Sequence, residues 1–194
     1  MARPREFDVD SALESAMRTF WAQGYEATSV DDLCESTGLG RSSLYAAFGD
    51  KRGLYLRALD HYEEKSAARL AAALAGPRPI RNSIAAFLSR IIEDIVSGPG
   101  RRGCFIGNCA AELPRRDRAA AAQIRRSLVR LEGVFREALT RAKAGGEIDA
   151  AADVGALSRF LTSGIQGLRL VGKANPDRKA LGDIAMVMLQ ALDP

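Results

Sequence analysis

Residues 24–54 read GYEATSVDDLCESTGLGRSSLYAAFGDKRGL and contain two short amphipathic patterns separated by a glycine-containing turn. Ser29-x-x-Asp32 is a capping box with aspartate in place of glutamate, so we expect the first helix to begin at Ser29. Gly38 suits the left-handed cap that ends this helix, and a second helix begins at about Arg41. Two short helices joined in this way form a helix-turn-helix, whose second helix can enter the major groove of DNA.

These residues resemble the TetR family of bacterial transcriptional repressors. The match keeps many fixed spacings over about 35 positions, which makes it more specific than an isolated helix-turn-helix pattern. Two positions depart from the family pattern: Gly40 stands where the family usually has a capping serine, and Ser42 where it usually has glycine. Glycine is an acceptable N-cap, whereas Ser42 could alter which base pairs are read. The matching residues are Phe20, Gly24, Tyr25, Thr28, Ser29, Val30, Leu33, Gly38, Leu39, Ser43, Leu44, Tyr45, Phe48, Lys51 and Leu54.

Hydrophobic periodicity predicts an all-α fold of about nine helices, and no period-2 strand pattern occurs. The clearest break is the linker at residues 76–79, which reads GPRP. We expect a helix-turn-helix DNA-binding domain at residues 1–50 and a regulatory and dimerisation domain at residues 51–194, with the fourth helix connecting the two. The expected helices cover about residues 8–23, 29–36, 41–48, 51–75, 80–96, 104–113, 114–143, 152–172 and 176–192.

Composition and charge narrow the class of protein. No apolar run approaches 18 residues, and the N-terminus has no signal-peptide apolar region, so we expect a cytoplasmic protein without a membrane partner. We expect the protein to be bacterial and to associate with the nucleoid when it is bound to DNA. Residues 1–55 hold six Lys or Arg and nine Asp or Glu, a net charge of −3, whereas the remaining residues carry +7. Any affinity for DNA must therefore depend on a few well-placed cations.

The candidate DNA contacts lie in and around the motif. Arg41 can bond guanine bidentately, and Ser42 and Ser43 are short donors at the start of the recognition helix. Thr28 could donate to a phosphate at the start of the preceding helix, or serve only as a capping residue. The family resemblance implies phosphate contacts from Tyr45 and Lys51, and it implies a basic arm at Arg3 and Arg5 that could reach a minor groove.

A possible thiol sensor lies at residues 101–113, which read RRGCFIGNCAAEL. Cys104 falls at a predicted helix N-terminus beside Arg101 and Arg102. The helix dipole and the two guanidinium groups would each stabilise the negatively charged thiolate, which is the reactive form. The pattern is similar to that of a TetR-like subgroup associated with reactive compounds or metals. The alternative is that Cys34, Cys104 and Cys109 are small buried hydrophobic residues. Three cysteines without CxxC spacing argue against a disulfide framework or a zinc site, and we expect no metal.

A ligand cavity between the fifth to eighth helices is the competing sensor. Aromatic and aliphatic residues at helical spacing could line this cavity, and three polar residues could orient a ligand in it. The alternative is that the aromatic and aliphatic residues belong to the ordinary hydrophobic core. The candidate lining residues are Phe87, Ile91, Phe105, Phe135, Phe160 and Ile165, with Asn108, Glu112 and Gln166 as the polar groups.

The last two predicted helices, residues 152–172 and 176–192, carry more apolar side chains than a terminal surface helix needs. They could be internal core, or they could pack on their copy as a two-fold four-helix bundle. The TetR resemblance implies the homodimer. A dimer can also place two recognition helices in successive major grooves, roughly 34–36 Å apart.

Enzymatic function has little support in the sequence. Hydrolase, zinc-protease, P-loop and dinucleotide-binding motifs are absent, no cofactor is implied, and the single histidine, His61, fits a solvated helix face. The sequence therefore predicts a repressor that binds a palindromic operator as a dimer and is released by a small molecule or a thiol-reactive inducer. A helical scaffold, or a constitutive DNA-binding protein without an inducer, is the alternative.

Overall fold

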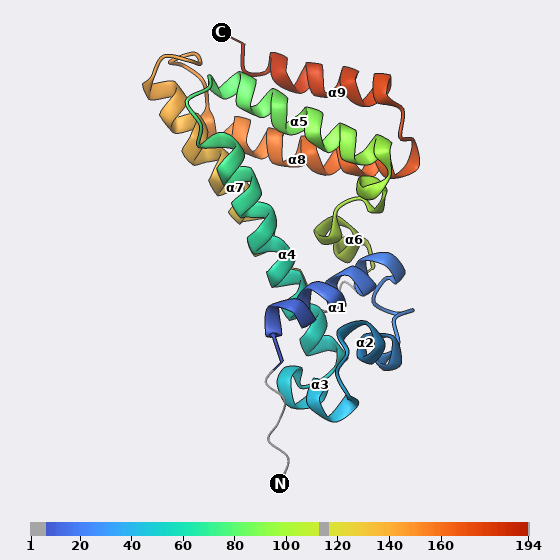
Figure 1. Cartoon of the computed structure of the whole chain (residues 1–194). Helices are drawn as coiled ribbons and strands as arrows, with labels where there is room; N and C mark the ends of the chain where they lie inside the picture. The colour runs from blue at the N-terminus through green and yellow to red at the C-terminus, as the bar shows by residue number, and fades with distance from the viewer. Residues whose placement is uncertain (1–6, 113–116, 194) are drawn as a thin grey trace.

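The computed structural model describes residues 7–112 and 117–193, and within them it contains nine α-helices, one 3-10 turn and no strand. The predicted all-α class is confirmed. Figure 1 shows the helices in two tiers joined by α4. The elements are α1 (Val9–Gln23), α2 (Val30–Thr37), α3 (Arg41–Phe48), α4 (Lys51–Leu74), α5 (Ile80–Ser97), the 3-10 turn η1 (Pro99–Arg102), α6 (Phe105–Glu112), α7 (Arg118–Ala144), α8 (Val154–Ala174) and α9 (Arg178–Gln190).

Local sequence signals set the helix boundaries of the motif. The Ser29 hydroxyl accepts from the Asp32 N–H at 3.0 Å, and the Asp32 carboxylate accepts from the Ser29 N–H at 2.7 Å, so the predicted capping box is present. Gly38 ends α2 with φ of 69°, in the left-handed region that favours glycine. These contacts stabilise the two ends of α2 independently of the rest of the chain.

The junction between α3 and α4 is unusually close. Asp50 caps α4 by accepting from the Gly53 N–H at 2.6 Å. A Cβ atom on Gly53 would lie 2.1 Å from the carbonyl oxygen of Phe48, so this position has room only for glycine. The C-terminal end of α3 therefore lies directly against the first turn of α4.

The N-terminal tier has one core made by α1 to α4 together with α6. Phe20 of α1, Leu44 of α3 and Tyr55 of α4 are almost completely buried there. Cys104, just before α6, belongs to the same cluster, as do three residues of α6 itself: Phe105, Ile106 and Cys109. The segment at residues 101–113, which the sequence analysis assigned to the regulatory domain, thus packs inside the core of the N-terminal tier.

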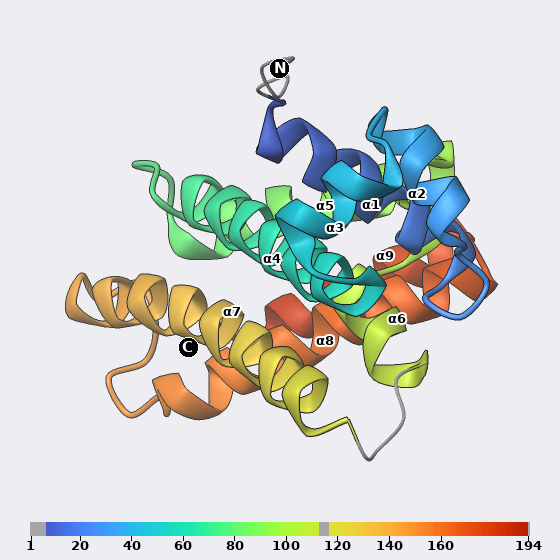
Figure 2. The same cartoon turned by 90° about the horizontal axis from the view of Figure 1, so that it is seen from below.

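The upper tier has a separate core made by α5, α7, α8, α9 and the C-terminal half of α4. Leu70 of α4, Phe135 of α7 and Leu161 of α8 are buried in it. Seen from below in Figure 2, α4 runs alongside α7. Because α4 contributes side chains to both cores, it links the two tiers.

Several helix starts differ from the sequence-based expectation, and aspartate caps explain the differences. The helix α7 begins at Arg118, after the cap Asp117, rather than at Pro114, which lies outside the described residues. Asp153 and Asp177 likewise cap α8 and α9 two residues later than expected. The segment between the expected helices at residues 80–96 and 104–113 contains the 3-10 turn η1.

Among residues 7–112 and 117–193, no helix combines the length and the apolar character needed to cross a bilayer.

Candidate nucleic-acid interface

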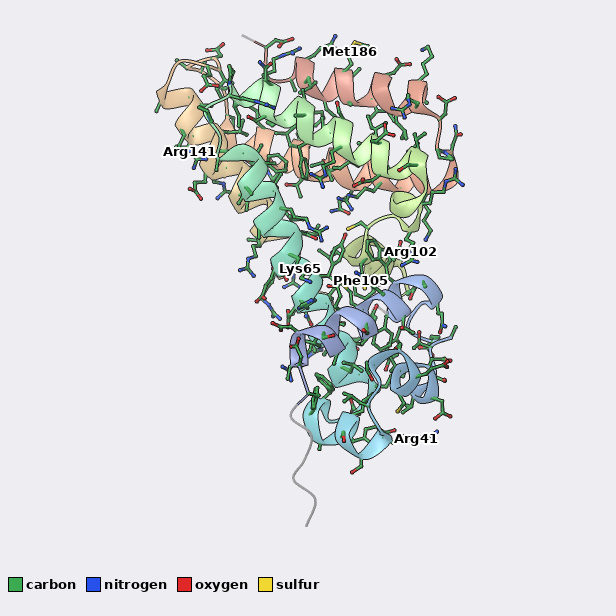
Figure 3. The ribbon with its side chains drawn as sticks, viewed as in Figure 1. Arg41, Lys65, Arg102, Phe105, Arg141 and Met186 are labelled. Carbon is green, nitrogen blue, oxygen red and sulfur yellow. The ribbon has the colours of Figure 1, made fainter. Side chains whose placement is uncertain are left out.

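The first turn of α3 projects away from the protein. Leu44 and Phe48 face the N-terminal core and are buried, whereas Ser42, Ser43 and Tyr45 are exposed. Figure 3 shows Arg41 at the lower edge of the molecule, at the start of the same helix. The helix therefore buries one face and presents hydroxyl, phenol and guanidinium groups on the other, as base and phosphate contacts require.

Arg41 is held by an acidic residue of α2. Its Nη2 atom lies 2.7 and 2.8 Å from the two carboxylate oxygens of Asp31, and its Nε atom lies 3.1 Å from one of them. Both side chains are well exposed to solvent. The guanidinium group is thus held between α2 and α3, and any base edge that binds Arg41 must compete with Asp31 for it.

Lys51 lies where the helix-turn-helix meets α4. Its Nζ atom is 4.5 Å from the centre of the Tyr25 ring and 3.5 Å from the carbonyl oxygen of Glu26. These two contacts are weak and leave the ammonium group partly in solvent, so it is available to a phosphate. The sequence pattern had no signal for the Tyr25 contact, because it spans more than twenty residues.

Thr28 has a role different from the predicted one. Its hydroxyl donates to the carbonyl oxygen of Gly24 at 2.6 Å, and the residue is buried. The hydroxyl proton is therefore used within the protein and is not directed at a phosphate. Arg3 and Arg5, the predicted basic arm, lie outside the described residues.

The segment with the predicted thiol sensor is hydrogen-bonded to α4. The hydroxyl of Tyr55 donates to Cys109 Sγ at 2.8 Å, and that of Tyr62 donates to Cys104 Sγ at 3.8 Å. Phe105 packs edge-on against both tyrosine rings, with centroids 5.8 and 5.7 Å apart. Instead of lining a ligand cavity, Phe105 lies in the contact between α6 and the DNA-binding tier.

Burial determines the chemistry of these groups. It raises the pKa of Cys109 to about 12, although the hydrogen bond from Tyr55 acts in the opposite direction. It also raises the pKa of Tyr62 to about 12. At neutral pH both groups are therefore neutral, and Cys109 is a hydrogen-bond acceptor in a core rather than a thiolate.

Two of the polar residues predicted to orient a ligand hold the backbone instead. The Glu112 carboxylate accepts from the backbone N–H of Tyr25 at 3.0 Å. The Asn108 amide donates to the carbonyl oxygen of Arg102 at 2.9 Å and accepts from Lys173 at 3.3 Å. Both residues tether α6 to neighbouring segments and do not line the cavity described next.

A small cavity of about 30 Å³ lies between α4, α5, α6, α7 and α8. This volume has room for one or two water molecules, far below the size of a typical ligand site. The Gln166 Oε1 atom is buried in this wall without a hydrogen-bond partner among the residues that the structure describes. Five predicted residues line the cavity, namely Phe87, Cys104, Phe135, Ile165 and Gln166, together with Tyr62, Ser66, Leu70, Ile106, Leu131, Thr162 and Arg169.

The remaining predicted cavity residues lie elsewhere. Ile91 is buried in the core of the upper tier. Phe160 is 42% exposed on the outer face of α8. The helical spacing of these residues was the same as that of true lining residues, so periodicity alone could not separate them.

A polar seam between α4 and α7 was not predicted. Arg52 forms a two-pronged ion pair with Asp117, at 2.7 and 3.1 Å. The Gln123 amide donates to the carbonyl oxygen of Leu56 at 2.6 Å. The seam ties the start of α7 to the first turns of α4, beside the residues expected to contact DNA.

The helix-turn-helix with its exposed α3, joined through one long helix to a second helical tier, defines a DNA-binding transcriptional regulator rather than an enzyme. The family model described as bacterial regulatory proteins of the tetR family matches residues 12–58, and the model described as a tetracyclin repressor-like C-terminal domain matches residues 80–188. The chain therefore belongs to the TetR family.

Individual relatives agree with this assignment. The chain is 35% identical to the HTH-type transcriptional repressor ComR of Escherichia coli K12, over 97% of this chain and 90% of ComR. It is 32% identical to the uncharacterized HTH-type transcriptional regulator YezE of Bacillus subtilis, over the whole length of both. A cysteine mutant of the TetR family regulator CifR, solved with 26-base-pair double-strand operator DNA, superposes with a TM-score of 0.85 at 32% identity, covering 97% of this chain and 99% of that chain.

Proposed function

We propose that the protein is a repressor that binds a palindromic operator as a homodimer and is released when an electrophile acts at Cys104 or a small molecule binds in the adjoining cavity. The recognition half of this proposal depends on the exposed turn of α3. Arg41 and Ser42 would reach base edges, and Tyr45 and Lys51 would contact phosphates. The relative CifR has been solved in complex with operator DNA, which supports operator binding by this chain. Operator binding would place the protein with the chromosome in the bacterial cytoplasm.

The homodimer proposal is supported by the outer faces of α8 and α9. Five large apolar side chains on these two helices are more than a third exposed: Phe160, Leu170, Val171, Met186 and Val187. Met186 is labelled at the upper edge of the molecule in Figure 3. A Cβ atom on Gly167 would meet no atom within 4 Å, so α8 also offers a place where a partner helix could approach closely. A two-fold pair of such faces would form a four-helix bundle.

The proposed release mechanism depends on Cys104. This residue lines the 30 Å³ cavity and belongs to the core of the DNA-binding tier, and it accepts from Tyr62 of α4. An electrophile that forms a carbon–sulfur bond at Sγ, with loss of the thiol proton, would add atoms for which there is no space. Because cores are close-packed, α6 or α4 would have to move.

A reversible ligand is the second candidate inducer, favoured by the Gln166 side-chain carbonyl, which has no hydrogen-bond partner in the part of the chain that the structure describes. A small apolar molecule that donates a hydrogen bond to this oxygen would satisfy a buried acceptor that otherwise destabilises the fold. The cavity would have to expand to admit it. Such a molecule releases DNA only if it binds the expanded arrangement better than the DNA-bound one.

A gel shift with fragments from upstream of the chain's own and neighbouring genes tests the proposal. We expect a shift that N-ethylmaleimide abolishes for the wild type but not for Cys104→Ser, with Cys34→Ser as the matched control that stays sensitive. Equal release of all three proteins would leave only the cavity as sensor. A shift that no compound reverses would indicate constitutive binding, and the absence of any shift would favour a helical scaffold.

A further inference from the structure

A second and larger cleft, of about 510 Å³, opens between α1 and α4 at the level of η1. This volume lies within the range of small-molecule sites. Apart from Tyr62 and Ser66, its lining residues differ from those of the 30 Å³ cavity. The cleft is therefore a separate place on the molecule, bordered by the first helix of the DNA-binding tier and by the connecting helix α4.

Positive charge dominates the lining of this cleft. Four cationic side chains line it, from three elements: Arg18 of α1, Lys65 and Arg69 of α4, and Arg102 of η1. The single carboxylate that lines it is Glu14. Side chains from three elements that are far apart in the sequence thus bring a surplus of positive charge to one concave surface.

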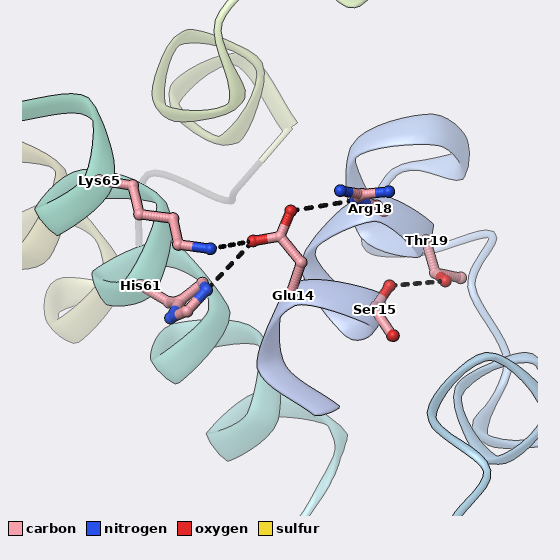
Figure 4. A network of polar contacts seen from close by, with 6 residues as sticks. All are labelled: Glu14, Ser15, Arg18, Thr19, His61 and Lys65. Carbon is pink, nitrogen blue, oxygen red and sulfur yellow. Dashed lines mark hydrogen bonds and ion pairs between the residues drawn. The ribbon is translucent and has the colours of Figure 1, made fainter. Parts of the chain in front are cut away.

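The Glu14 carboxylate already has three basic partners, as Figure 4 shows. It lies 2.6 Å from Lys65 Nζ, 3.0 Å from Arg18 Nε and 3.2 Å from His61 Nε2. His61 is therefore part of this network and not of a solvated helix face. Within residues 7–112 and 117–193, neither Arg69 nor Arg102 has a carboxylate oxygen within 4.0 Å, so two guanidinium groups remain for an external anion.

One wall of the cleft is aromatic and held in place. The Trp21 indole N–H donates to the carbonyl oxygen of Arg102 at 3.2 Å. Its ring packs edge-on against Tyr62 with centroids 5.1 Å apart. The indole is thus fixed between α4 and η1, and it contributes an aromatic side chain to the lining of the cleft.

We propose that this cleft binds a small aromatic carboxylate. Guanidinium groups match the planar geometry of a carboxylate with two parallel hydrogen bonds, which Arg69 and Arg102 are free to make. The Trp21 surface would hold the ring. Because Arg69 lies on α4, Arg102 on η1 and Trp21 on α1, such a ligand would bridge all three elements.

The position of the cleft argues against the DNA backbone as its occupant. In Figure 3, Lys65 and Arg102 lie on the side of α1 opposite to Arg41, which marks the start of the recognition helix. A duplex that contacts α3 would meet the lower edge of the molecule, whereas the cleft opens above α1. The positive charge here is therefore directed at something other than the operator.

Trp21 is the only tryptophan in the chain, so its fluorescence reports on the cleft. We would titrate the purified full-length protein with benzoate, with benzamide as the uncharged analogue and with inorganic phosphate as an anion without a ring. We expect a saturable change in emission for benzoate and none for benzamide. Because a hydrogen bond to a charged group contributes about 1.5–3 kcal/mol, Arg69→Gln should weaken benzoate binding about tenfold or more.

The matched control is Arg141→Gln, an exposed arginine of α7 that Figure 3 shows far from the cleft. It should bind benzoate like the wild type, and thermal melting should show that both variants fold. No saturable response to benzoate, an equal response to benzamide, or unchanged binding by Arg69→Gln would overturn the proposal. Equal affinity for inorganic phosphate would show that the ring is not recognised. Loss of operator binding by Arg69→Gln would instead assign the cleft to the DNA backbone.

Discussion

The backbone N–H of Tyr25 lies 3.0 Å from the carboxylate of Glu112, which joins the turn after α1 to the end of α6. The same carboxylate lies against Gly24, where a Cβ atom would come within 3.0 Å of it. Gly24 also has φ of 84°, so a side chain there would be strained as well as crowded. This contact connects α6 directly to the segment that leads into α2.

Removing this tether should loosen the DNA-binding tier. We expect Glu112→Ala to lower the free energy of unfolding by about 1 kcal/mol, because the Tyr25 N–H loses its partner. Glu112→Gln keeps an acceptor oxygen and should cost less. Urea denaturation measures both effects, and identical curves for Glu112→Ala and the wild type would show that the contact contributes nothing.

Arg41 should carry sequence discrimination. Arg41→Ala is expected to weaken operator binding by about 1–3 kcal/mol and to relax the preference at one base pair in each half-site. Lys51→Ala is the matched comparison, since it should weaken all sequences alike and reduce the salt slope by about one. Gel shifts over a panel of operator variants at several salt concentrations distinguish the two. If both variants behaved like the wild type, another surface would bind DNA.

The exposed face of α9 should hold the dimer together. We expect Val187→Glu to give a monomer, because a charge buried in an apolar interface is costly. The matched control is Val129→Glu on α7, where the native side chain is exposed to the same degree, at 61% against 60%. Sedimentation velocity gives the outcome, and a monomer should also lose operator affinity. A dimer that survives in Val187→Glu would contradict the proposed bundle.

Glu14 should make stability depend on pH in acid. Partial burial raises its pKa, but the hydrogen bonds from Lys65 and its other partners outweigh burial and lower the pKa from 4.5 to about 2. A carboxylate with a lowered folded-state pKa stabilises the fold above the unfolded pKa, and this contribution is lost as the pH falls through the folded pKa.

The stability difference between the wild type and Glu14→Gln should therefore shrink between about pH 5 and pH 2. Urea denaturation at a series of pH values measures it. Glu137→Gln removes an exposed pair with Arg141 and should have little effect throughout. A difference for Glu14→Gln that stays constant down to the lowest pH would mean that the network is not formed.

Cys109 should resist alkylation. Burial raises its pKa to about 12, so almost none of it is thiolate near neutral pH. Cys34 is only half-buried and should react with iodoacetamide first. Mass spectrometry of timed samples gives the order, and urea should make Cys109 accessible. Labelling of both residues at one rate in the folded protein would refute this assignment.

Local signals were enough to predict much of the fold. Helix caps are made between residues only three or four positions apart, so they can be recognised in the sequence. Examples are the Ser29–Asp32 capping box, Gly38 and the aspartate caps. The position of α6 could not be predicted in the same way. Its attachment to α4 depends on Tyr55 and Tyr62, more than forty residues away, and nothing in the local pattern of RRGCFIGNCAAEL indicates which core it joins.

The candidate site shows the same division. The exposed and buried positions of α3 follow from its helical period, so Arg41 and Tyr45 could be placed from the sequence. Three phenylalanines with the same helical spacing lie in three different surroundings. Phe105 is in the core of the N-terminal tier, Phe135 lines the 30 Å³ cavity, and Phe160 is exposed on the surface. The Thr28 hydroxyl donates to the Gly24 carbonyl, a contact that the sequence pattern did not indicate.

The contact of Gly53 with the Phe48 carbonyl gives α4 the mechanical property of a lever. Because no slack exists between α3 and α4, any rotation of α4 must carry the recognition helix with it. With 24 residues at 1.5 Å each, α4 is about 36 Å long, so a tilt of about 5° at its upper end sweeps the lower end through about 3 Å. That displacement is about the length of one hydrogen bond. In a two-fold dimer both α4 helices would tilt, so the distance between the two recognition helices would change by twice as much.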